Sequence, residues 1–421
     1  METPVAERLH IAILGTRNSG KSSLVNTLTG QKVSLVSDMP GTTTDPVSKA
    51  MEIPGAGPCV LIDTAGFDDD GQIGDLRVAR TGMALDRTDM AILVFRQDNQ
   101  EPEKHSDIYS KWCKILSDRN IPTIPVLNIS SHAQTAAPSS GIQTGIRAMA
   151  NIVTRLTGKE PLTVNAATGE GMEAIFDAIR NIAEKNSADN LSLTGNLAKS
   201  GDAVLLVMPQ DSEAPKGRLI LPQVQTIREL MDKGCTAICC TPETMGTALA
   251  SLSCPPDLII TDSQAFAKVW AARPEGCRVT SFSILFAAYK GDLKVFLEGA
   301  KALDRLTESS RILIAEACTH APATEDIGRV KIPAMLKKRL GNGVGIDIVA
   351  GNNFPEDLSG YDLIIHCGAC MFNRKYVMHR IDSAAKLNIP ITNYGMTIAW
   401  ATGILDKISL PTRNRNLTIS G

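Results

Sequence analysis

A glycine-rich loop near the N-terminus constrains the fold of this 421-residue chain more than any other feature. Leu9–Leu14 is an apolar run typical of a buried strand, and it leads directly into Gly15–Ser22, which reads G-x-x-x-x-G-K-S. A helical apolar pattern follows through Leu24, Val25 and Leu28. A strand before the loop and a helix after it are the context expected of a phosphate-binding loop. The chain should therefore begin with an α/β unit that binds a nucleotide.

The residues of this loop have separate chemical tasks. Lys21 should neutralise the β- and γ-phosphates, and the Ser22 hydroxyl should hold Mg²⁺. The glycines let backbone amides wrap around the phosphates, and the helix N-terminus adds its partial positive charge. We expect the phosphates to be bound by Gly15, Asn18, Ser19, Gly20, Lys21, Ser22 and Ser23.

Two further motifs follow downstream. Asp38–Asp45 contains a Gly-Thr-Thr sequence, and Leu61–Gly66 is an apolar strand that ends in Asp-x-x-Gly. Together with the loop, these motifs resemble the GTPases of the Era and TrmE type. The resemblance implies that Thr43 is a Mg²⁺ ligand, that Asp63 touches Mg²⁺ through water and that Gly66 senses the γ-phosphate. The catalytic residues expected in this domain are Lys21, Thr43 and Asp63.

Three positions qualify that resemblance. Phe67 stands where Ras-like proteins carry their catalytic glutamine, so intrinsic hydrolysis should be slow. Asn18 matches the position that coordinates K⁺ in TrmE-like members; the alternative is a polar loop residue without that role. Asn128–Ser131 reads Asn-Ile-Ser-Ser where Asn-Lys-x-Asp is the pattern, so the carboxylate that accepts two hydrogen bonds from guanine is missing. Asn128 and Ala166 are the remaining contacts expected near the base, and guanine recognition is inferred from the other motifs.

Two short clusters of cysteine and histidine stand in the C-terminal third. Cys318–His320 follows the apolar run Arg311–Ala315, and His366–Cys370 follows Leu363–Ile365. Both runs read as buried parallel strands, whose carboxyl ends meet at one edge of a sheet. The two clusters can therefore converge on one metal centre. A Cys-x-x-Cys spacing lets both thiolates reach that centre, and we expect Gly368 to supply the turn.

The cysteine pattern leaves more than one kind of centre open. Three thiolates with an exchangeable fourth position suit an iron–sulfur cluster, whereas structural zinc favours four fixed ligands. The motif alone does not separate these two. A redox dithiol and plain core packing are the other interpretations of an isolated Cys-x-x-Cys.

Composition describes an ordinary globular protein. The hydrophobic fraction is 43%, the charged fraction is 21% and the net charge is −2, so no global electrostatic feature favours nucleic acid or an anionic membrane. No apolar run approaches the roughly 18 residues that span a bilayer. Ten cysteines without an export signal indicate thiols or metal ligands instead of disulfides, and the expected compartment is the cytoplasm.

The length predicts two to three domains. We expect an α/β chain with a P-loop GTPase domain over 1–185, a linker over 186–198, a βαβ dimerisation domain over 199–275 and a doubly wound α/β metal-cluster domain over 276–421. The middle unit is small for an independent core, so a dimer that extends its sheet is expected there; the alternative is packing on its neighbours. Its cysteines should be small buried hydrophobes: Cys235, Cys239, Cys240 and Cys254.

This order of units resembles the maturation GTPases of iron-only (FeFe) hydrogenases, the HydF family. Besides the cysteine motifs, the stretch Glu213–Gln223 carries the likeness. The resemblance implies a homodimer, and a 4Fe–4S cluster on Cys318, Cys367 and Cys370. It also implies a scaffold that receives a diiron precursor from two radical-SAM maturases and delivers it to apo-hydrogenase. His320 and His366 would bind iron, orient a cyanide-type ligand, or hydrogen-bond the backbone.

The competing hypothesis is an RNA-acting GTPase, for tRNA modification or ribosome assembly, with a structural zinc domain. The downstream nucleotide-binding motifs fit it equally well. The balanced charge and the lack of basic runs mixed with aromatic residues speak against it. A third hypothesis is a redox enzyme that uses Cys367 and Cys370, which would need a depressed thiol pKa.

Overall fold

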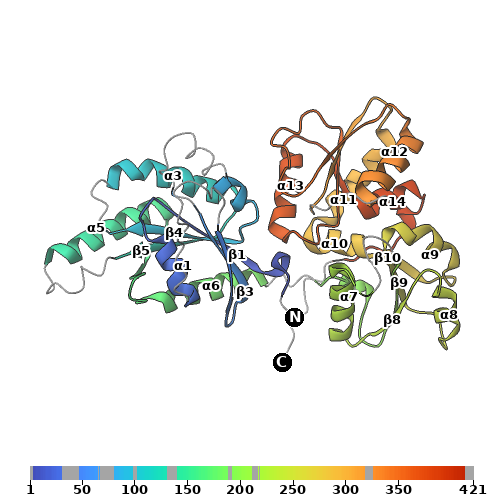
Figure 1. The fold of residues 1–421 in the computed structure, drawn as a ribbon, viewed down its shortest axis with the longest axis horizontal. Coiled ribbons are helices and arrows are strands. Elements are labelled where there is room, and N and C mark those ends of the chain that lie inside the picture. Colours follow the sequence, from blue (N-terminus) through green and yellow to red (C-terminus); the bar gives the residue numbers. More distant parts are fainter. Residues whose placement is uncertain are drawn as a thin grey trace. The chain divides into compact units, whose positions relative to one another are not determined.

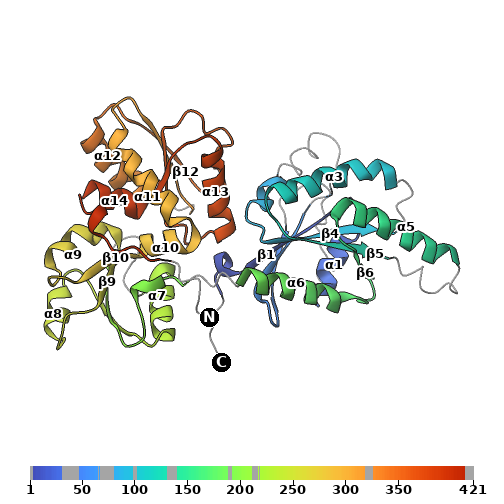
Figure 2. The ribbon, with the colours of Figure 1, turned by 180° about the vertical axis from the view of Figure 1, so that it is seen from behind.

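We describe the protein from a computed structural model. The structure describes residues 3–30, 47–64, 66, 80–97, 102–129, 140–187, 192–210, 217, 219–317 and 326–412. The chain divides into two compact units, residues 1–189 and 190–421. Figures 1 and 2 show the helices and strands of each unit from opposite sides. Among the described residues, no helix combines the length and the apolar character that crossing a membrane requires.

The first unit is a six-stranded sheet in the order β2-β3-β1-β4-β5-β6, with only β2 antiparallel to its neighbour. Its strands are β1 (Leu9–Gly15), β2 (Val47–Ile53), β3 (Gly57–Asp63), β4 (Met90–Arg96), β5 (Thr123–Asn128) and β6 (Leu162–Val164). The helices are α1 (Lys21–Thr29), α3 (Pro102–Asp118), α5 (Ser140–Thr157) and α6 (Met172–Ser187). Apolar side chains of α1 and α6 pack on one face, and those of α3 and α5 pack on the other. This is the doubly wound P-loop architecture that the sequence predicts.

The second unit contains two parallel sheets, each of four strands. The first has the order β10-β9-β7-β8. Its strands are β7 (Ala203–Val207), β8 (Thr236–Cys240), β9 (Leu258–Thr261) and β10 (Arg278–Ser281). Its helices are α7 (Leu221–Asp232), α8 (Met245–Ala250), α9 (Phe266–Ala272) and α10 (Phe282–Lys290).

The other sheet has the order β12-β11-β13-β14. Its strands are β11 (Arg311–Ala315), β12 (Gly345–Val349), β13 (Leu363–His366) and β14 (Ile391–Asn393). Its helices are α11 (Leu293–Ala302), α12 (Ile332–Leu340), α13 (Arg374–Lys386) and α14 (Tyr394–Ala401). One apolar core runs through both sheets, and α10 touches α7 as well as α13 and α14, so the two sheets form one body.

Two segments differ from the expected organisation of this unit. The strand over Arg278–Ser281, which we expected to open the third domain, pairs with β9 and belongs to the middle sheet. Part of the expected linker is packed: Leu193 and Leu197 are buried in the core of that sheet. The carboxylate of Glu229 accepts hydrogen bonds from the amides of Leu193 and Thr194, which fixes this segment to α7. Polar composition alone does not reveal such contacts.

Candidate functional site

The phosphate-binding loop connects β1 to α1, as its sequence predicts. Gly20 has a left-handed backbone (φ 97°), and a Cβ atom there would collide with the side-chain nitrogen of Asn128. Lys21 is only 8% exposed, and its ammonium group donates to the carbonyl oxygens of Gly15 (3.1 Å) and Thr16 (2.8 Å). A buried cation held by the loop's own carbonyls is placed to meet an anion that enters the loop.

Ser22 and Asp63 form the polar pair expected at a Mg²⁺ position. The Ser22 hydroxyl donates to Oδ2 of Asp63 (2.8 Å). The other oxygen, Oδ1, is buried without a hydrogen-bond partner among the described residues. Burial raises the pKa of the Asp63 carboxyl, while the Ser22 bond and the nearby Lys21 oppose that rise. An orphaned, desolvated carboxylate oxygen beside a hydroxyl fits a hard divalent cation, so these residues fit Mg²⁺.

Asn128 ties the phosphate loop to the β6–α6 loop. Its Nδ2 donates to the carbonyl of Ser19 (3.0 Å), and its Oδ1 accepts from the amide of Ala166 (3.0 Å). The Thr27 hydroxyl donates to the Ala166 carbonyl (2.6 Å). The two residues expected near the base are therefore joined to the phosphate loop at the carboxyl edge of β5 and β6. The two ends of the Asn128 side-chain amide thus hold the phosphate loop and the β6–α6 loop together.

Sequence reasoning missed two supports of this site. Tyr109 of α3 accepts a hydrogen bond from the Thr16 amide (3.3 Å) and donates to the Val94 carbonyl (2.9 Å), bracing the phosphate loop against β4. Asn165 is fully buried, and its Oδ1 accepts from the amides of the two residues after Ala166. Tyr109 lies in no recognisable motif. Asn165 stands beside Ala166 in the loop expected near the base, and an asparagine in a turn is a general signal for such side-chain-to-backbone bonds.

The other residues that we expected to bind the nucleotide differ in exposure and in whether the structure describes them. The side chain of Asn18 is exposed, its backbone is left-handed (φ 60°), and its carbonyl accepts from Arg96 (3.3 Å). Ser19 is buried, and Gly66 is described at the end of the β3 segment. Ser23 lies in the first turn of α1. Thr43, Phe67, Ser130 and Ser131 lie outside the described residues.

The Cys-x-x-Cys loop begins where β13 ends at the carboxyl edge of its sheet. His366 is in register with Ala315 of β11, and the amide of Cys367 donates to the Ala315 carbonyl (3.0 Å). The sulfur of Cys367 accepts hydrogen bonds from two backbone amides, those of Ala317 (3.0 Å) and Ala369 (3.4 Å). Amides aimed at a sulfur stabilise a thiolate, and such bonds are among the features that tune iron–sulfur centres.

The left-handed residue in this loop is Ala369 (φ 55°), so the expectation that Gly368 supplies the sharp turn was wrong. Ala369 is buried, whereas Gly368 is half-buried. A methyl group is therefore packed at the left-handed residue itself, whose own amide points at the Cys367 sulfur. The loop's conformation is fixed by this packing more than by glycine flexibility.

Cys367 and Cys370 line one cavity of about 180 Å³. Its wall also includes Glu316, Asp326 and Tyr394. Burial raises the pKa of the Cys367 thiol to about 11, while its two amide donors and the charge of Arg380 act in the opposite direction. A thiol in such surroundings ionises when a metal takes its proton's place. The two cysteines fit a thiolate-bound centre.

Acidic residues of the cavity belong to an ordered network. Glu316 is 3% exposed and pairs with Arg329 (3.0 Å), while the hydroxyl of Tyr394 donates to its other oxygen (3.4 Å). Asp326 accepts from the amide of Arg329 at the start of a π-helical turn, Ile327–Lys331. Such π-helical segments are frequent at functional sites. The sequence patterns did not point to any of these four side chains.

His366 is fully buried beside the cysteines, with both ring nitrogens engaged. Its Nδ1 lies 2.8 Å from the carbonyl oxygen of Cys367, and its Nε2 lies 2.9 Å from Nη1 of Arg380. A guanidinium only donates, so Nε2 is the acceptor and Nδ1 carries the hydrogen. Desolvation and the nearby charge of Arg380 lower the pKa of His366 to about 3. Of the roles expected for this histidine, the geometry corresponds to hydrogen bonding with the backbone.

The remaining expected ligands, Cys318 and His320, lie outside the described residues. Ala317, the last described residue of this segment, donates its amide hydrogen to the Cys367 sulfur. Over the described ranges alone, no group of three or more His, Cys, Asp and Glu side chains forms a metal site.

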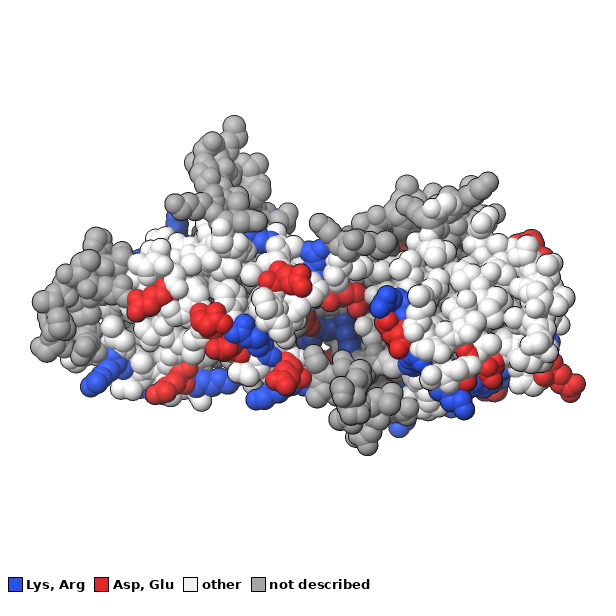
Figure 3. Space-filling view, turned by 90° about the horizontal axis from the view of Figure 1, so that it is seen from below, with Lys and Arg blue, Asp and Glu red and all other residues white. Residues whose placement is uncertain are grey.

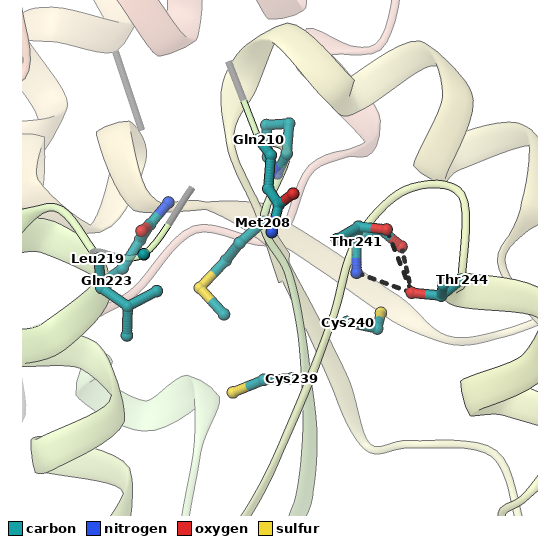
Figure 4. A pocket seen from close by; sticks show the side chains of 10 residues that line it. Met208, Gln210, Leu219, Gln223, Cys239, Cys240, Thr241 and Thr244 are labelled. Atoms are coloured by element: carbon teal, nitrogen blue, oxygen red, sulfur yellow. Dashed lines mark hydrogen bonds between the residues drawn. The ribbon is translucent and has the colours of Figure 1, made fainter. Parts of the chain in front are cut away.

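A second cavity, of about 560 Å³, lies at the carboxyl edge of β7 and β8 (Figure 4). Its labelled lining has no charged side chain, and the amide of Thr241 donates to the Thr244 hydroxyl there (3.0 Å). The sulfurs of Cys239 and Cys240 point in different directions, as neighbours on a strand do (Figure 4). The expectation of buried cysteines in this domain was wrong, because Cys239 and Cys254 are exposed and Cys235 and Cys240 are only half-buried.

Comparison with protein-family models divides the chain into three matches. Residues 10–129 match a model described as a 50S ribosome-binding GTPase. Residues 193–291 match the hydrogen maturase F dimerization domain, and residues 294–410 match the hydrogen maturase F tetramerization domain. The two hydrogen maturase F matches together cover more than half of the chain.

The curated relatives match a smaller part of this chain. The tRNA modification GTPase MnmE of Nitrosomonas europaea is 29% identical over 174 residues, which are 41% of this chain and 34% of that protein. GTPase Der of Hyphomonas neptunium is 34% identical over 177 residues, 41% of this chain and 31% of that protein. The chain thus spans about a third of the length of these relatives. A solved structure of Era with MgGDPNP and 16S ribosomal RNA is 17% identical, covers 55% of this chain and 92% of that chain, and has a TM-score of 0.34.

The comparisons agree with the geometry on both halves of the chain. The phosphate loop, the Ser22–Asp63 pair and Asn128 lie within or beside the GTPase match, and the Cys-x-x-Cys loop lies within the tetramerization-domain match. A GTPase domain joined to these two domains is the arrangement that the sequence resemblance predicts. The chain belongs to the hydrogen maturase F family and is a GTPase whose catalytic domain is followed by the family's dimerization and tetramerization domains.

Proposed function

We propose that this protein is a GTP-hydrolysing scaffold of FeFe-hydrogenase maturation. It holds a 4Fe–4S cluster on Cys318, Cys367 and Cys370, carries a diiron precursor and delivers that precursor to apo-hydrogenase. The observation that carries the proposal is the Cys367 sulfur at the carboxyl edge of β13, with two backbone amides aimed at it and Cys370 on the same cavity. Family membership supports the same conclusion.

The nucleotide half of the proposal rests on the phosphate loop. Lys21 neutralises the phosphates, Ser22 and Asp63 hold Mg²⁺, and Thr43 joins them when the nucleotide is bound. Nucleotide binding would order the segments around Thr43 and Gly66, and hydrolysis would release them. We propose that this change tunes how long a partner stays bound and does not drive metal chemistry. Turnover should be slow and higher in K⁺ than in Na⁺ if Asn18 holds a monovalent cation.

The metal half rests on three thiolates. With three protein ligands, one iron of the cluster keeps an exchangeable position, which docking and release of a cargo fragment require. The chain's own residues contribute the amides that stabilise the Cys367 thiolate and the cavity wall of Glu316, Asp326 and Tyr394. The cargo would come from radical-SAM maturases and leave to apo-hydrogenase.

Assembly of copies is part of the proposal. The matched domains are a dimerization and a tetramerization domain, so the chain forms oligomers. We propose a homodimer through the middle sheet as the basic assembly. β8 is an edge strand of that sheet, and its residues are exposed or half-buried, so a second copy's β8 can extend the sheet there.

These observations give little support to the competing hypothesis of an RNA-acting GTPase. Its curated counterparts, such as MnmE, match this chain over 41% of its length only. The face drawn in Figure 3 has acidic and basic side chains interspersed, without a continuous basic stripe. A structural zinc domain would also call for a fixed fourth ligand.

The first experiment is anaerobic reconstitution with iron and sulfide, followed by EPR of the reduced protein. We expect a 4Fe–4S signal in the wild type and no signal in a variant with serine at Cys318, Cys367 and Cys370. Cys254→Ser is the matched control, because Cys254 is exposed and outside the site. Tight zinc binding without an iron–sulfur signal would overturn the proposal in favour of the RNA-acting GTPase. Transfer to apo-hydrogenase then tests delivery.

A further inference from the structure

Buried cations are rare in the described part of the chain and lie in two places. The Lys and Arg side chains that are less than a tenth exposed are Lys21, Lys290 and Arg380. Lys21 lies in the phosphate loop. Lys290 of α10 donates to the carbonyls of Cys370 (3.3 Å) and Phe372 (2.7 Å), and Arg380 of α13 bonds His366. Two of the three buried cations therefore border the cysteine loop.

Arg380 is the most deeply buried of them, at 0% exposure. Among the described residues it has no carboxylate partner. Its Nη1 donates to His366 and its Nη2 donates to the carbonyl of Gly351 (2.6 Å). Its Nε has no partner within the described ranges. A full charge buried in this way costs several kcal/mol unless an opposite charge compensates it.

Aromatic rings compensate only part of that charge. The guanidinium lies 4.7–4.8 Å from the ring centres of Phe354, Phe372 and Tyr376. A cation–π contact attracts the charge only weakly compared with a full negative charge. The two buried carboxylates of the cavity wall, Glu316 and Asp326, are already paired with Arg329. The geometry therefore calls for a negative charge from another source.

The hydrogen bonds of Arg380 lead to that source. Arg380 donates to Nε2 of His366, and Nδ1 of His366 donates to the carbonyl of Cys367. We propose that Arg380 is the buried counter-charge of the anionic, thiolate-bound iron–sulfur cluster, and that it positions Cys367 through His366, which is a hydrogen-bond link and not a metal ligand. This inference rests on the proposed cluster.

The proposal has a direct electrochemical consequence. Reduction adds a negative charge to the cluster, and a nearby buried cation favours the reduced state; net charge is one determinant of such potentials. Arg380→Gln keeps a hydrogen-bond donor for His366 but removes the charge, whereas Arg380→Lys keeps the charge. We expect Arg380→Gln to lower the reduced-to-oxidised ratio at a fixed potential at least tenfold, about 59 mV for a one-electron couple. Arg380→Lys should stay close to the wild type.

The experiment is an EPR-monitored redox titration of the full-length, untagged, reconstituted protein. Arg311→Gln is the matched control, because Arg311 is exposed, lies at the amino end of β11 and pairs with Asp347 of the neighbouring strand β12 (2.8 Å). An unchanged potential in Arg380→Gln, with the wild-type cluster formed, overturns the inference. If the wild type forms no cluster at all, the proposed function fails first, so the two failures are distinguishable.

Two further readouts separate a counter-charge from a structural arginine. Cluster loading should raise the Tm of the wild type more than that of Arg380→Gln, and equal losses of Tm in the apo and loaded forms contradict the inference. Pulsed EPR should show no strong imidazole nitrogen coupling, and His366→Gln should leave the nitrogen spectrum unchanged. A coupling that disappears in His366→Gln makes His366 a ligand and overturns the link. If Arg380→Gln does not fold, Arg380→Met provides the neutral variant.

Discussion

The phosphate loop and the cysteine loop both follow a buried strand at the carboxyl edge of a parallel sheet, but they present their buried cations differently. Lys21 stands inside the loop that binds the ligand, held by the carbonyls of Gly15 and Thr16. Arg380 stands behind its loop and reaches Cys367 only through His366. The first arrangement lets the cation touch a ligand that comes and goes. The second arrangement suits a resident metal cluster whose redox potential is influenced by a cation that does not contact it.

This difference also shows in how the loops are built. The phosphate loop carries Lys21 and Ser22 in one continuous segment, which Tyr109 and Asn128 brace from outside. The cysteine site is instead assembled from β11, β13 and α13. A local loop depends on backbone conformation, and a site assembled from several elements depends on packing. The predictions below test whether the two sites are independent and whether each depends on the feature named here.

The largest expected effect is on catalysis. Lys21→Ala removes the cation that neutralises the phosphates, so GTP turnover should fall by about 10²–10³-fold, the usual loss when a preorganised electrostatic group is removed. The iron content of the reconstituted protein should not change. Lys111→Ala, on the exposed face of α3, is the control and should keep full turnover. Iron loss in Lys21→Ala would contradict the independence of the two sites.

The next effect concerns the backbone of the phosphate loop. Gly20→Ala forces a side chain into a left-handed conformation, at about 1–2 kcal/mol, and pushes it into Asn128. Asn128 would then lose its bonds to Ser19 and Ala166, at about 1 kcal/mol each. Urea unfolding should report the sum of these contributions, a loss of about 3–4 kcal/mol.

Gly30→Ala is a matched control for that variant. Gly30 is also left-handed (φ 63°), but nothing lies within 4 Å of its added Cβ. It should lose only the backbone contribution, about 1 kcal/mol. Equal losses in both variants would show that contact with Asn128 contributes nothing to the loop.

The third effect is a pH dependence of the cysteine site in the apoprotein. The pKa of His366 is lowered from 6.5 to about 3, because burial and Arg380 disfavour its charged form. Below pH 6.5 the unfolded chain therefore binds a proton that the folded chain does not. Stability from this residue is complete above pH 6.5 and falls by about 1.4 kcal/mol per pH unit below it. Unfolding at pH 7.5, 6.5 and 5.5 measures this slope, and His366→Gln should be flatter; parallel slopes would contradict a buried neutral imidazole.

The same contrast explains what the sequence could predict. The phosphate loop and its strand and helix are local, so Gly15–Ser22 predicted the architecture of the first sheet and the positions of Lys21 and Ser22. The apolar runs before the cysteines likewise predicted β11 and β13. Arg380 could not be predicted, because its role depends on α13 packing against the end of β13, and an arginine in a helix usually indicates a solvated face.

Errors in the prediction have equally specific causes. β10 was assigned to the third domain because the sequence of a short strand does not reveal which sheet it joins. Leu193 and Leu197 were placed in a linker because their polar neighbours dominate the composition there. Gly368 was expected to make the turn because alanine is disfavoured in a left-handed conformation, and only the packing around Ala369 shows why alanine is used.

The smallest expected effect tests that last point. Ala369→Gly relieves a left-handed alanine, a gain of about 1 kcal/mol. It also loses a buried methyl group, which costs about 0.8 kcal/mol, and it raises the conformational entropy of the unfolded chain, which lowers stability further. These contributions nearly cancel, so the free energy of unfolding should change by less than about 1 kcal/mol, in contrast with the larger loss for Gly20→Ala.

Ala384→Gly is the control, because Ala384 is equally buried but lies in the helical turns of α13. It loses the same methyl group and adds the cost of glycine in a helix, about 1 kcal/mol, with no strain to relieve. We therefore expect Ala384→Gly to cost about 1.5–2 kcal/mol in urea unfolding and Ala369→Gly to cost clearly less. Equal costs would mean that Ala369 is not left-handed in solution. The hydrogen bond from the Ala369 amide to the Cys367 sulfur would then need an explanation other than this turn. The conformation of the cysteine loop would then depend on packing alone and not on a left-handed residue.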